Sequence, residues 1–170
     1  LIELAAMGAA KRPAALHTLY ISPLKALAVD VARNLEQPAA EMALPIRIET
    51  RTGDTPPSRR QRQKYHPPDI LLTTPEQLSL LLSAPDASRF FGSVRAVVLD
   101  ELHALYNSKR GDLLALALSR LEAIAPGHRR IGLSATVNDP APLRRFLVPQ
   151  QPGENAMADL VLGQGGARPE

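Results

Sequence analysis

The feature that most constrains the fold is a short apolar run, Ala96 to Leu99, which ends abruptly at Asp100 and Glu101. Four such residues are too few for a helix and are typical of a buried parallel strand, which stops where the charges begin. The two acids are therefore predicted at the carboxyl end of a strand, where open α/β sheets bind ligands. One carboxylate there can hold Mg²⁺, directly or through its water, while its neighbour activates a water that attacks a phosphate. The alternative is a strand end with solvated acids.

Short apolar or alternating runs elsewhere predict four further strands, separated by segments with helical spacing of apolar residues. The predicted strands are residues 19–21, 46–50, 70–73, 96–99 and 131–133. The predicted helices are residues 1–10, 24–41, 58–64, 109–125 and 140–147, with another that begins at Pro75. Strands that alternate with helices in this way favour an α/β fold, a parallel sheet with helices on both faces.

The carboxyl-terminal part of the sequence differs in composition from the rest. After Val148 it is rich in Pro, Gln and Gly, and only residues 160–162 resemble a strand. We therefore predict one domain over residues 1–150 and a linker or tail over residues 151–170. The sequence also begins without methionine inside an expected helix, so we expect it to be a fragment of a longer protein.

Composition excludes several classes of protein. The apolar fraction of 45% and the charged fraction of 22% are those of a globular protein, and no apolar run has the length of a membrane span. The sequence has no cysteine, which excludes a disulfide framework and a cysteine-ligated metal. With no basic leader visible, this fits a cytoplasmic location. The net charge of +3 permits a polyanionic partner without requiring one.

Two predicted helix beginnings carry features that bind anions. Ser22 and Pro23 precede a helix with Lys25 near its start. Thr74, Pro75 and Glu76 stand in a similar way at the start of the helix predicted from Pro75. Hydroxyls, backbone N–H groups and a lysine at a helix N-terminus favour a phosphate, such as that of a nucleic acid. The alternative is ordinary helix capping by the hydroxyl side chains.

A glycine turn and a basic run follow the strand predicted at residues 46–50. Thr52 and Gly53 form the turn, and the glycine lets another backbone approach closely, although an ordinary turn explains the same residues. The basic run could follow a line of phosphates, but such runs are more often solvated surface. Its residues are Arg59, Arg60, Arg62 and Lys64.

Three further polar residues follow strand ends. His103 lies two residues after Glu101, and Ser134 and Thr136 follow the last predicted strand. If strands 96–99 and 131–133 are neighbours, these side chains lie beside the two acids. His103 would then be close enough to relay the state of a bound nucleotide to the two hydroxyls. The other histidines are interpreted as structural or solvated.

Taken in order, these segments resemble a known set of motifs. Motifs Ia, Ib, II and III of superfamily 2 DExH-box helicases are similar to Ser22-Pro-Leu-Lys-Ala-Leu, Thr73-Thr-Pro-Glu, Asp100-Glu-Leu-His and Ser134-Ala-Thr. A narrower resemblance to the large helicase-related (Lhr-like) group and to ligase-associated DExH helicases rests on Thr52-Gly-Asp-Thr-Pro, residues 68–76 and Ser108-Lys-Arg-Gly. The resemblance covers roughly residues 1–147.

The resemblance implies the first RecA-like domain of an ATP-dependent motor, and it implies residue roles. Asp100 would coordinate the Mg²⁺ of ATP, and Glu101 would be the base for the attacking water. His103, Ser134 and Thr136 would couple the nucleotide state to strand movement. The residues implied along the nucleic-acid backbone are Ser22, Pro23, Lys25, Thr52, Gly53, Thr74, Pro75, Glu76 and Arg110.

The sequence also departs from these helicases. It contains no G-x-x-x-x-G-K-S/T phosphate loop, and it lacks the adenine-reading segment and the second RecA-like domain with its arginine finger. We therefore expect this chain alone to bind ATP poorly and to hydrolyse it negligibly.

The resemblance implies that the parent protein is an ATP-driven helicase or translocase, with nucleic acid as its partner and DNA favoured over RNA. A second RecA-like domain of the same parent would be the other partner, and no membrane is expected. Two alternatives stay open. One is a RecA-like module that binds nucleic acid or protein without hydrolysis, and the other is the motor subunit of a restriction or remodelling complex.

Overall fold

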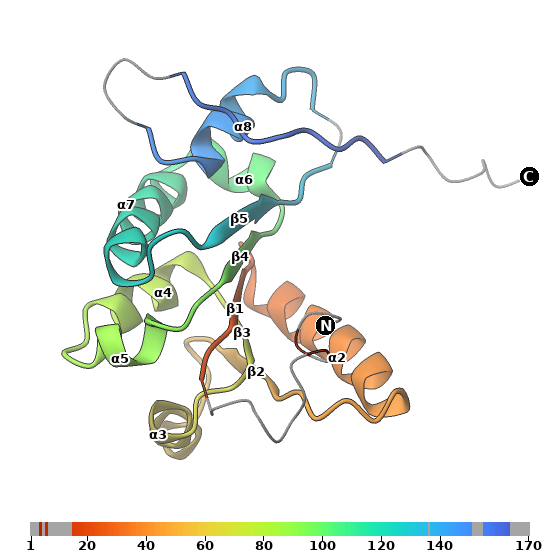
Figure 1. Ribbon diagram of the computed structural model, residues 1–170, viewed down its shortest axis with the longest axis vertical. Coiled ribbons are helices and arrows are strands. Elements are labelled where there is room, and N and C mark those ends of the chain that lie inside the picture. The colour runs from red at the N-terminus through yellow and green to blue at the C-terminus, as the bar shows by residue number, and fades with distance from the viewer. Residues whose placement is uncertain (1–3, 5, 7–14, 136, 151–154, 164–170) are drawn as a thin grey trace, which may run out of the picture.

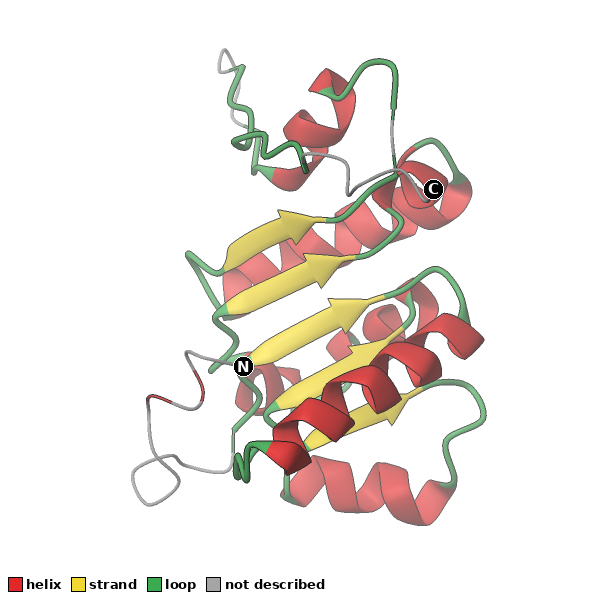
Figure 2. Cartoon of the chain, turned by 90° about the vertical axis from the view of Figure 1, so that its right-hand side faces the viewer, coloured by secondary structure: helices red, strands yellow, loops and turns green. Residues whose placement is uncertain are grey.

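A computed structural model describes residues 4, 6, 15–135, 137–150 and 155–163. In the described residues five strands form one parallel sheet in the order β2-β3-β1-β4-β5, with all arrows pointing the same way (Figure 2). The predicted parallel α/β fold is thereby confirmed. The strands are β1 (Thr18–Ile21), β2 (Ile48–Arg51), β3 (Ile70–Thr73), β4 (Ala96–Leu99) and β5 (Arg129–Gly132).

Helices cover both faces of the sheet (Figure 1). One face carries α2, while α4, α5 and α7 lie on the other, α6 and α8 cover the β4–β5 end, and α3 lies at the β2 end. The helices are α2 (Lys25–Glu41), α3 (Pro57–Tyr65), α4 (Pro75–Leu82), α5 (Ala87–Phe91), α6 (Leu102–Tyr106), α7 (Lys109–Ile124) and α8 (Ala141–Leu147). No helix among these is long and apolar enough to cross a membrane.

Each face of the sheet buries its own apolar cluster. Along β1, Leu19 and Ile21 belong to the larger cluster with α4 to α8, whereas Tyr20 packs against the smaller cluster under α2. This alternation follows from the two-residue period of a strand. The four residues of β3 are all buried, as expected for an inner strand covered on both faces.

The helix α7 shows how the sequence sets the packing. Ser108 caps it, since its Oγ accepts a hydrogen bond from the Gly111 N–H at 3.2 Å. Its face toward the sheet buries Leu114, Leu118 and Leu121, each worth about 1.5–3 kcal/mol of transfer free energy. Leu116, which shows the same helical spacing in the sequence, is instead 72% exposed.

Other predictions need correction at element boundaries. The strand predicted at residues 46–50 starts at Ile48, because the Arg47 N–H donates to the Asp69 carboxylate. The last strand begins at Arg129 and ends at Gly132, one residue before the end predicted for it. The expected strand at residues 160–162 is wrong, because these residues are exposed and lie in no strand.

Two short helices were missed. The five-residue helices α5 and α6 are too short to show a period in the sequence. Of the helix expected over residues 1–10, only Leu4 and Ala6 lie within the described residues, and both are helical.

Candidate functional site

The carboxyl ends of all five strands meet at one edge, because the sheet is parallel. The register aligns Ile21 with both Thr73 and Leu99, and it aligns Arg51 with Thr73 and Gly132 with Leu99. The segments singled out in the sequence analysis leave the sheet directly after these positions. One edge of the domain therefore carries the candidate site.

The acidic pair follows β4, next to the central strand β1. The Asp100 N–H donates to the Ile21 carbonyl at 2.9 Å, which ties it to β1. The Glu101 N–H donates to Asp100 Oδ1 at 3.0 Å, and Glu101 has a left-handed backbone with φ of 47°. A non-glycine residue in that region is strained, and such strain is often found at functional sites.

His103 contacts both Glu101 and Ser134 beyond the paired ends of β4 and β5. The Leu102 N–H donates to the Leu133 carbonyl at 2.9 Å, which brings the start of α6 against the end of β5. His103 Nδ1 then lies 3.3 Å from Glu101 Oε2 and 3.1 Å from Ser134 Oγ. The predicted juxtaposition of these residues is present. Thr136, assigned to the same cluster, lies outside the described residues.

Tyr20 is a member of this site that the sequence analysis missed. It lies opposite Val98 on the neighbouring strand, so its side chain shares a face with Asp100 two residues on. Burial raises the pKa of the Tyr20 hydroxyl, and a hydrogen bond with Asp100 together with the charges of Asp100 and Glu101 raises it further. Strand register could have found this residue, but only with the strand order already known.

The donor set fits a magnesium ion shared with a phosphate ligand. The described residues contain no group of three or more His, Cys, Asp or Glu able to hold a metal ion by themselves. Mg²⁺ does not need such a cage, since it keeps several waters and takes one or two carboxylates plus substrate phosphates. Asp100 is partly exposed at the strand end and can supply one such carboxylate.

The turn after β2 forms the second part of the edge. Thr52 Oγ1 accepts from the Asp54 N–H at 3.3 Å, and the Thr52 N–H donates to Thr55 Oγ1 at 2.9 Å. Lys25 Nζ at the start of α2 lies 3.0 Å from Asp54 Oδ1. Both side chains are more than half exposed, so the pair is weak and Lys25 can turn toward another anion. Gly53 is exposed beside Lys25.

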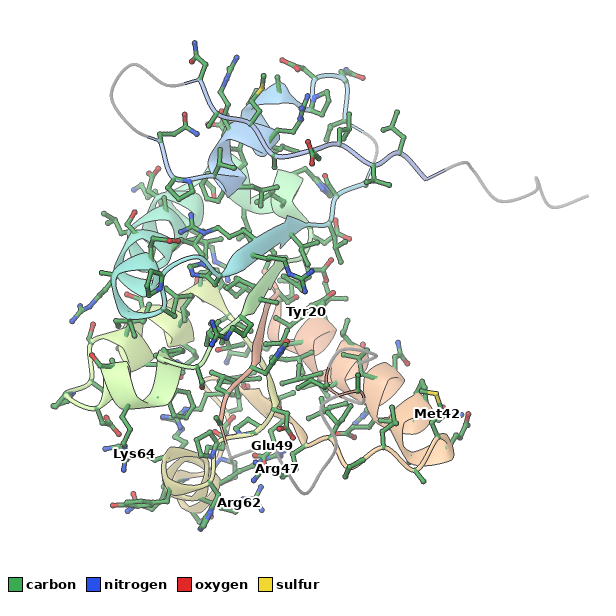
Figure 3. All side chains as sticks on the ribbon, viewed as in Figure 1. Tyr20, Met42, Arg47, Glu49, Arg62 and Lys64 are labelled. Carbon is green, nitrogen blue, oxygen red and sulfur yellow. The ribbon has the colours of Figure 1, made fainter. Side chains whose placement is uncertain are left out.

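The basic run on α3 has partners within the domain. Arg60 donates to the carbonyls of Gly53 and Thr55, both at 2.7 Å, and so stabilises the turn after β2. Arg59 and Arg62 pair with Glu49, at 3.4 and 2.8 Å; Glu49 and Arg62 are labelled in Figure 3. The run is therefore engaged in structural contacts, and the phosphate-track interpretation is not supported by its geometry.

Glu76 and Arg110 link the first turns of α4 and α7. Arg110 donates through Nε and Nη2 to the two oxygens of Glu76, at 2.5 and 3.0 Å. These hydrogen bonds lower the pKa of the Glu76 carboxyl to about 2, against a smaller opposing effect of burial. The resemblance implied that both residues contact the nucleic-acid backbone. The structure shows that Glu76 and Arg110 bind each other.

The remaining predicted residues are largely buried. Ser22 and Thr74 are 0% and 4% exposed, and neither makes the helix-capping hydrogen bond that the sequence suggested. The α2 cap position is Leu24, and Ser22 Oγ is buried without a hydrogen-bond partner. Pro23 and Pro75 are buried as well. These residues shape the loops at the edge, while Lys25, Gly53 and Arg110 reach its surface.

A five-stranded parallel sheet with helices on both faces, and with polar side chains at its carboxyl edge, is the architecture of a RecA-like domain. The family model described as DEAD/DEAH box helicase matches residues 1–143. The chain belongs to the DEAD/DEAH box helicase family.

Comparison with known relatives also confirms the resemblance to the Lhr-like group. The chain is 49% identical over 146 residues to the Lhr helicase/probable uracil glycosylase of Mycolicibacterium smegmatis, a match that covers 79% of this chain and 10% of that protein. It is 46% identical over 141 residues to the ATP-dependent helicase Lhr-Core of Methanothermobacter thermautotrophicus, covering 78% of this chain and 16% of that protein. The chain thus spans less than a fifth of the length of these relatives.

Solved structures agree with the fold. The structure of Mycobacterium smegmatis helicase Lhr bound to ssDNA and AMP-PNP superposes with a TM-score of 0.73 and 46% identity, covering 85% of this chain and 19% of that one. The DEAD-box helicase Mss116 bound to ssRNA and UDP-BeF superposes with a TM-score of 0.67 at 20% identity, covering 74% and 26% of the two chains. The second likeness concerns the fold alone.

Proposed function

We propose that this chain is the greater part of the first motor domain, over residues 1–150, of an ATP-driven nucleic-acid helicase or translocase. The observation that carries the proposal is the cluster in which His103 Nδ1 contacts both Glu101 Oε2 and Ser134 Oγ, directly beside Asp100. Such a cluster can bind a nucleotide phosphate at one end and sense its loss at the other. Similarity to helicases named Lhr supports the same conclusion.

Each residue of the cluster has a role in this proposal. Asp100 would hold Mg²⁺, which neutralises phosphate charge when bound. Glu101 orients the attacking water and accepts its proton, as a positioned carboxylate does in phosphoryl transfer. When Glu101 changes its contacts, His103 responds because it contacts Glu101, and Ser134 responds because it contacts His103. Ser134 follows β5 in the chain, so it shifts with the end of that strand. We assign Thr136 to the same coupling role from sequence alone.

The nucleic acid lies along the other half of the edge. Lys25, Gly53 and Arg110 are placed to contact its phosphates directly, and such contacts carry no base specificity. Glu76 holds Arg110 in position through the paired hydrogen bonds. The buried residues Ser22, Pro23, Thr52, Thr74 and Pro75 shape the loops of this track.

Three further parts of the proposal concern the parent protein. A second RecA-like domain, joined through residues 151–170, closes over the ATP and completes the site. The nucleic acid is DNA rather than RNA, which the Lhr structure with ssDNA supports. The protein acts in the cytoplasm, where ATP and nucleic acid are both present.

The decisive experiment measures ATP hydrolysis by the full-length parent with and without single-stranded DNA. Glu101→Gln is expected to leave ATP binding largely intact and to slow hydrolysis by about 10²-fold or more, because it removes the base and keeps the shape. Asp100→Ala is expected to abolish hydrolysis. The matched control is Glu36→Gln, which changes an exposed carboxylate on α2, about three helical turns beyond Lys25.

Each outcome decides between the candidate functions. ATP hydrolysis that single-stranded DNA stimulates, and that is lost in Glu101→Gln and Asp100→Ala but retained in Glu36→Gln, establishes the motor. Hydrolysis that survives Glu101→Gln removes Glu101 from the role of base. A parent with no hydrolysis under any condition is instead a binding module that uses the same fold.

A further inference from the structure

A groove separates α3 from α4 and α5, beside the end of β2. It encloses about 340 Å³, a volume comparable with sites that seat small ligands or a few side chains. One wall is apolar and includes Leu80, which is 65% exposed. The other apolar lining residues are Pro57, Leu81, Ala84, Ala87 and Phe90.

The end of the groove near β2 is cationic. Arg51 and Arg60 line this end, and the Asp86 carboxylate in the lining is paired with Lys64 at the other end. Arg51 Nε is buried and has no hydrogen-bond partner, while its Nη1 donates to the Arg60 carbonyl at 3.2 Å. Burial and the neighbouring charge of Arg60 both lower the pKa of the Arg51 guanidinium. An incoming carboxylate would therefore satisfy a charge that the domain leaves undercompensated.

The opposite end of the groove is closed by contacts between α3 and α5. Lys64 Nζ lies 3.3 Å from Asp86 Oδ2, and Arg89 lies 3.7 Å from the same oxygen. The Arg89 guanidinium also lies over the Tyr65 ring, 6.0 Å from its centroid. Figure 3 shows Lys64 on the side of α3 that faces α5. A ligand therefore meets an apolar wall, a cationic end and a closed end.

We propose that this groove binds a short amphipathic, acidic segment of a partner protein. An apolar side chain of the segment packs on Leu80 and Leu81, and a neighbouring carboxylate pairs with Arg51. The exposed leucine and the other apolar lining residues favour a polypeptide over nucleic acid. The lining residues are different from those assigned to ATP and nucleic acid, although Arg51 and Gln77 adjoin Thr52 and Glu76 in the chain. The groove therefore adds a docking function beside the motor's own site.

The test uses the full-length parent and a fluorescein-labelled peptide of about three helical turns, with leucines at i, i+3 and i+4 and glutamates beside them. Fluorescence anisotropy measures its affinity. Leu80→Glu is expected to weaken binding by about 10-fold or more, because it removes an apolar anchor and adds repulsion. Leu116→Glu is the matched control, since Leu116 is an equally accessible leucine on α7 at 72% exposed, and it should leave the affinity unchanged.

Two further peptides test the charge. Replacing the glutamates by glutamines should weaken binding several-fold, and replacing them by lysines should weaken it more. The proposal fails if Leu80→Glu binds as well as the parent, if the lysine peptide binds as well as the glutamate peptide, or if nothing binds at about 1 mM. Competition by oligothymidine would assign the groove to nucleic acid instead. Unchanged circular dichroism and DNA-stimulated ATP hydrolysis confirm that Leu80→Glu folds.

Discussion

The β4–β5 end of the sheet and its β2 end are held by different forces. At β4–β5, α6 and α7 pack through buried leucines such as Leu102, Leu114 and Leu118. At β2, α3 buries a single residue, Gln63, and is attached by ion pairs and hydrogen bonds to Glu49 and to the turn after the strand. One end is stabilised by non-directional apolar burial and the other by directional polar contacts.

The difference explains where free functional groups remain. Because leucines fix α6, the Glu101 and His103 side chains above them stay 43% and 36% exposed and can engage a ligand. Because polar contacts fix α3, most of its charged side chains are already paired, and Leu80 of the neighbouring α4 is left exposed. At the β4–β5 end, the side chains that hold the helices are different from those that can bind a ligand. At the β2 end, the charged side chains that could bind a ligand are the ones that hold α3.

The largest expected effect concerns the apolar end. Leu114→Ala removes a fully buried side chain of α7 and is expected to lower the free energy of unfolding by about 2–5 kcal/mol. Leu116→Ala, in the same helix but exposed, is expected to change it by less than about 0.5 kcal/mol. Urea unfolding of both variants measures the difference. Equal losses would show that α7 is not held by burial of one face.

A smaller effect is expected where α6 meets α7. A Cβ at Gly111 would overlap the Leu105 carbonyl oxygen and lie 2.8 Å from that of Tyr106. Gly111→Ala should therefore cost about 1–3 kcal/mol of unfolding free energy and speed hydrogen exchange in α6. Gly163→Ala meets no atom within 4 Å and serves as the control. Unchanged exchange in α6 would mean that the two helices are not packed as described.

The polar end is tested by Glu49→Gln. Burial tends to raise the pKa of Glu49, but hydrogen bonds from Gln63 and Arg62 outweigh it, so the pKa is lowered. The folded state therefore favours the charged carboxylate of Glu49. Loss of that charge is expected to cost about 1–2 kcal/mol and to speed hydrogen exchange in α3 more than in α7. Glu36→Gln is the control. A uniform change in both helices would contradict the independence of the two ends.

The smallest effect is a pH dependence at the Glu76–Arg110 pair. The folded pKa of Glu76 is lowered from 4.5 to about 2, so its stabilisation is complete above pH 4.5 and is lost as the pH falls toward 2. Because both side chains are more than a third exposed, the contribution is about 1 kcal/mol or less. Arg110→Gln should lower stability by this amount at pH 7 and by progressively less in acid. A constant difference would exclude the pair as its source.

Much of the fold and part of the site follow from sequence patterns. All five strands and the long helices α2 and α7 were predicted, because their periods extend over enough residues to be recognised. The short α5 and α6 were not, and the boundaries of β2 and β5 shifted because Arg47 and Arg130 have specific partners. Arg130 is nearly buried and pairs with Glu122, with 2.7 Å between Nη2 and Oε2. A charged residue thus lies inside β5, whereas the apolar pattern predicts a strand of uncharged residues only.

The sequence by itself determined the strand ends and the order in which chemical groups follow them. Those are local properties, set by the residue types within a few positions of each other. Only the tertiary structure decided that His103 meets Ser134, that Arg110 is bound by Glu76 and that the basic run of α3 is already paired. These outcomes depend on strand order and helix placement, which bring together residues about 30 positions apart and which cooperative burial of the whole core decides.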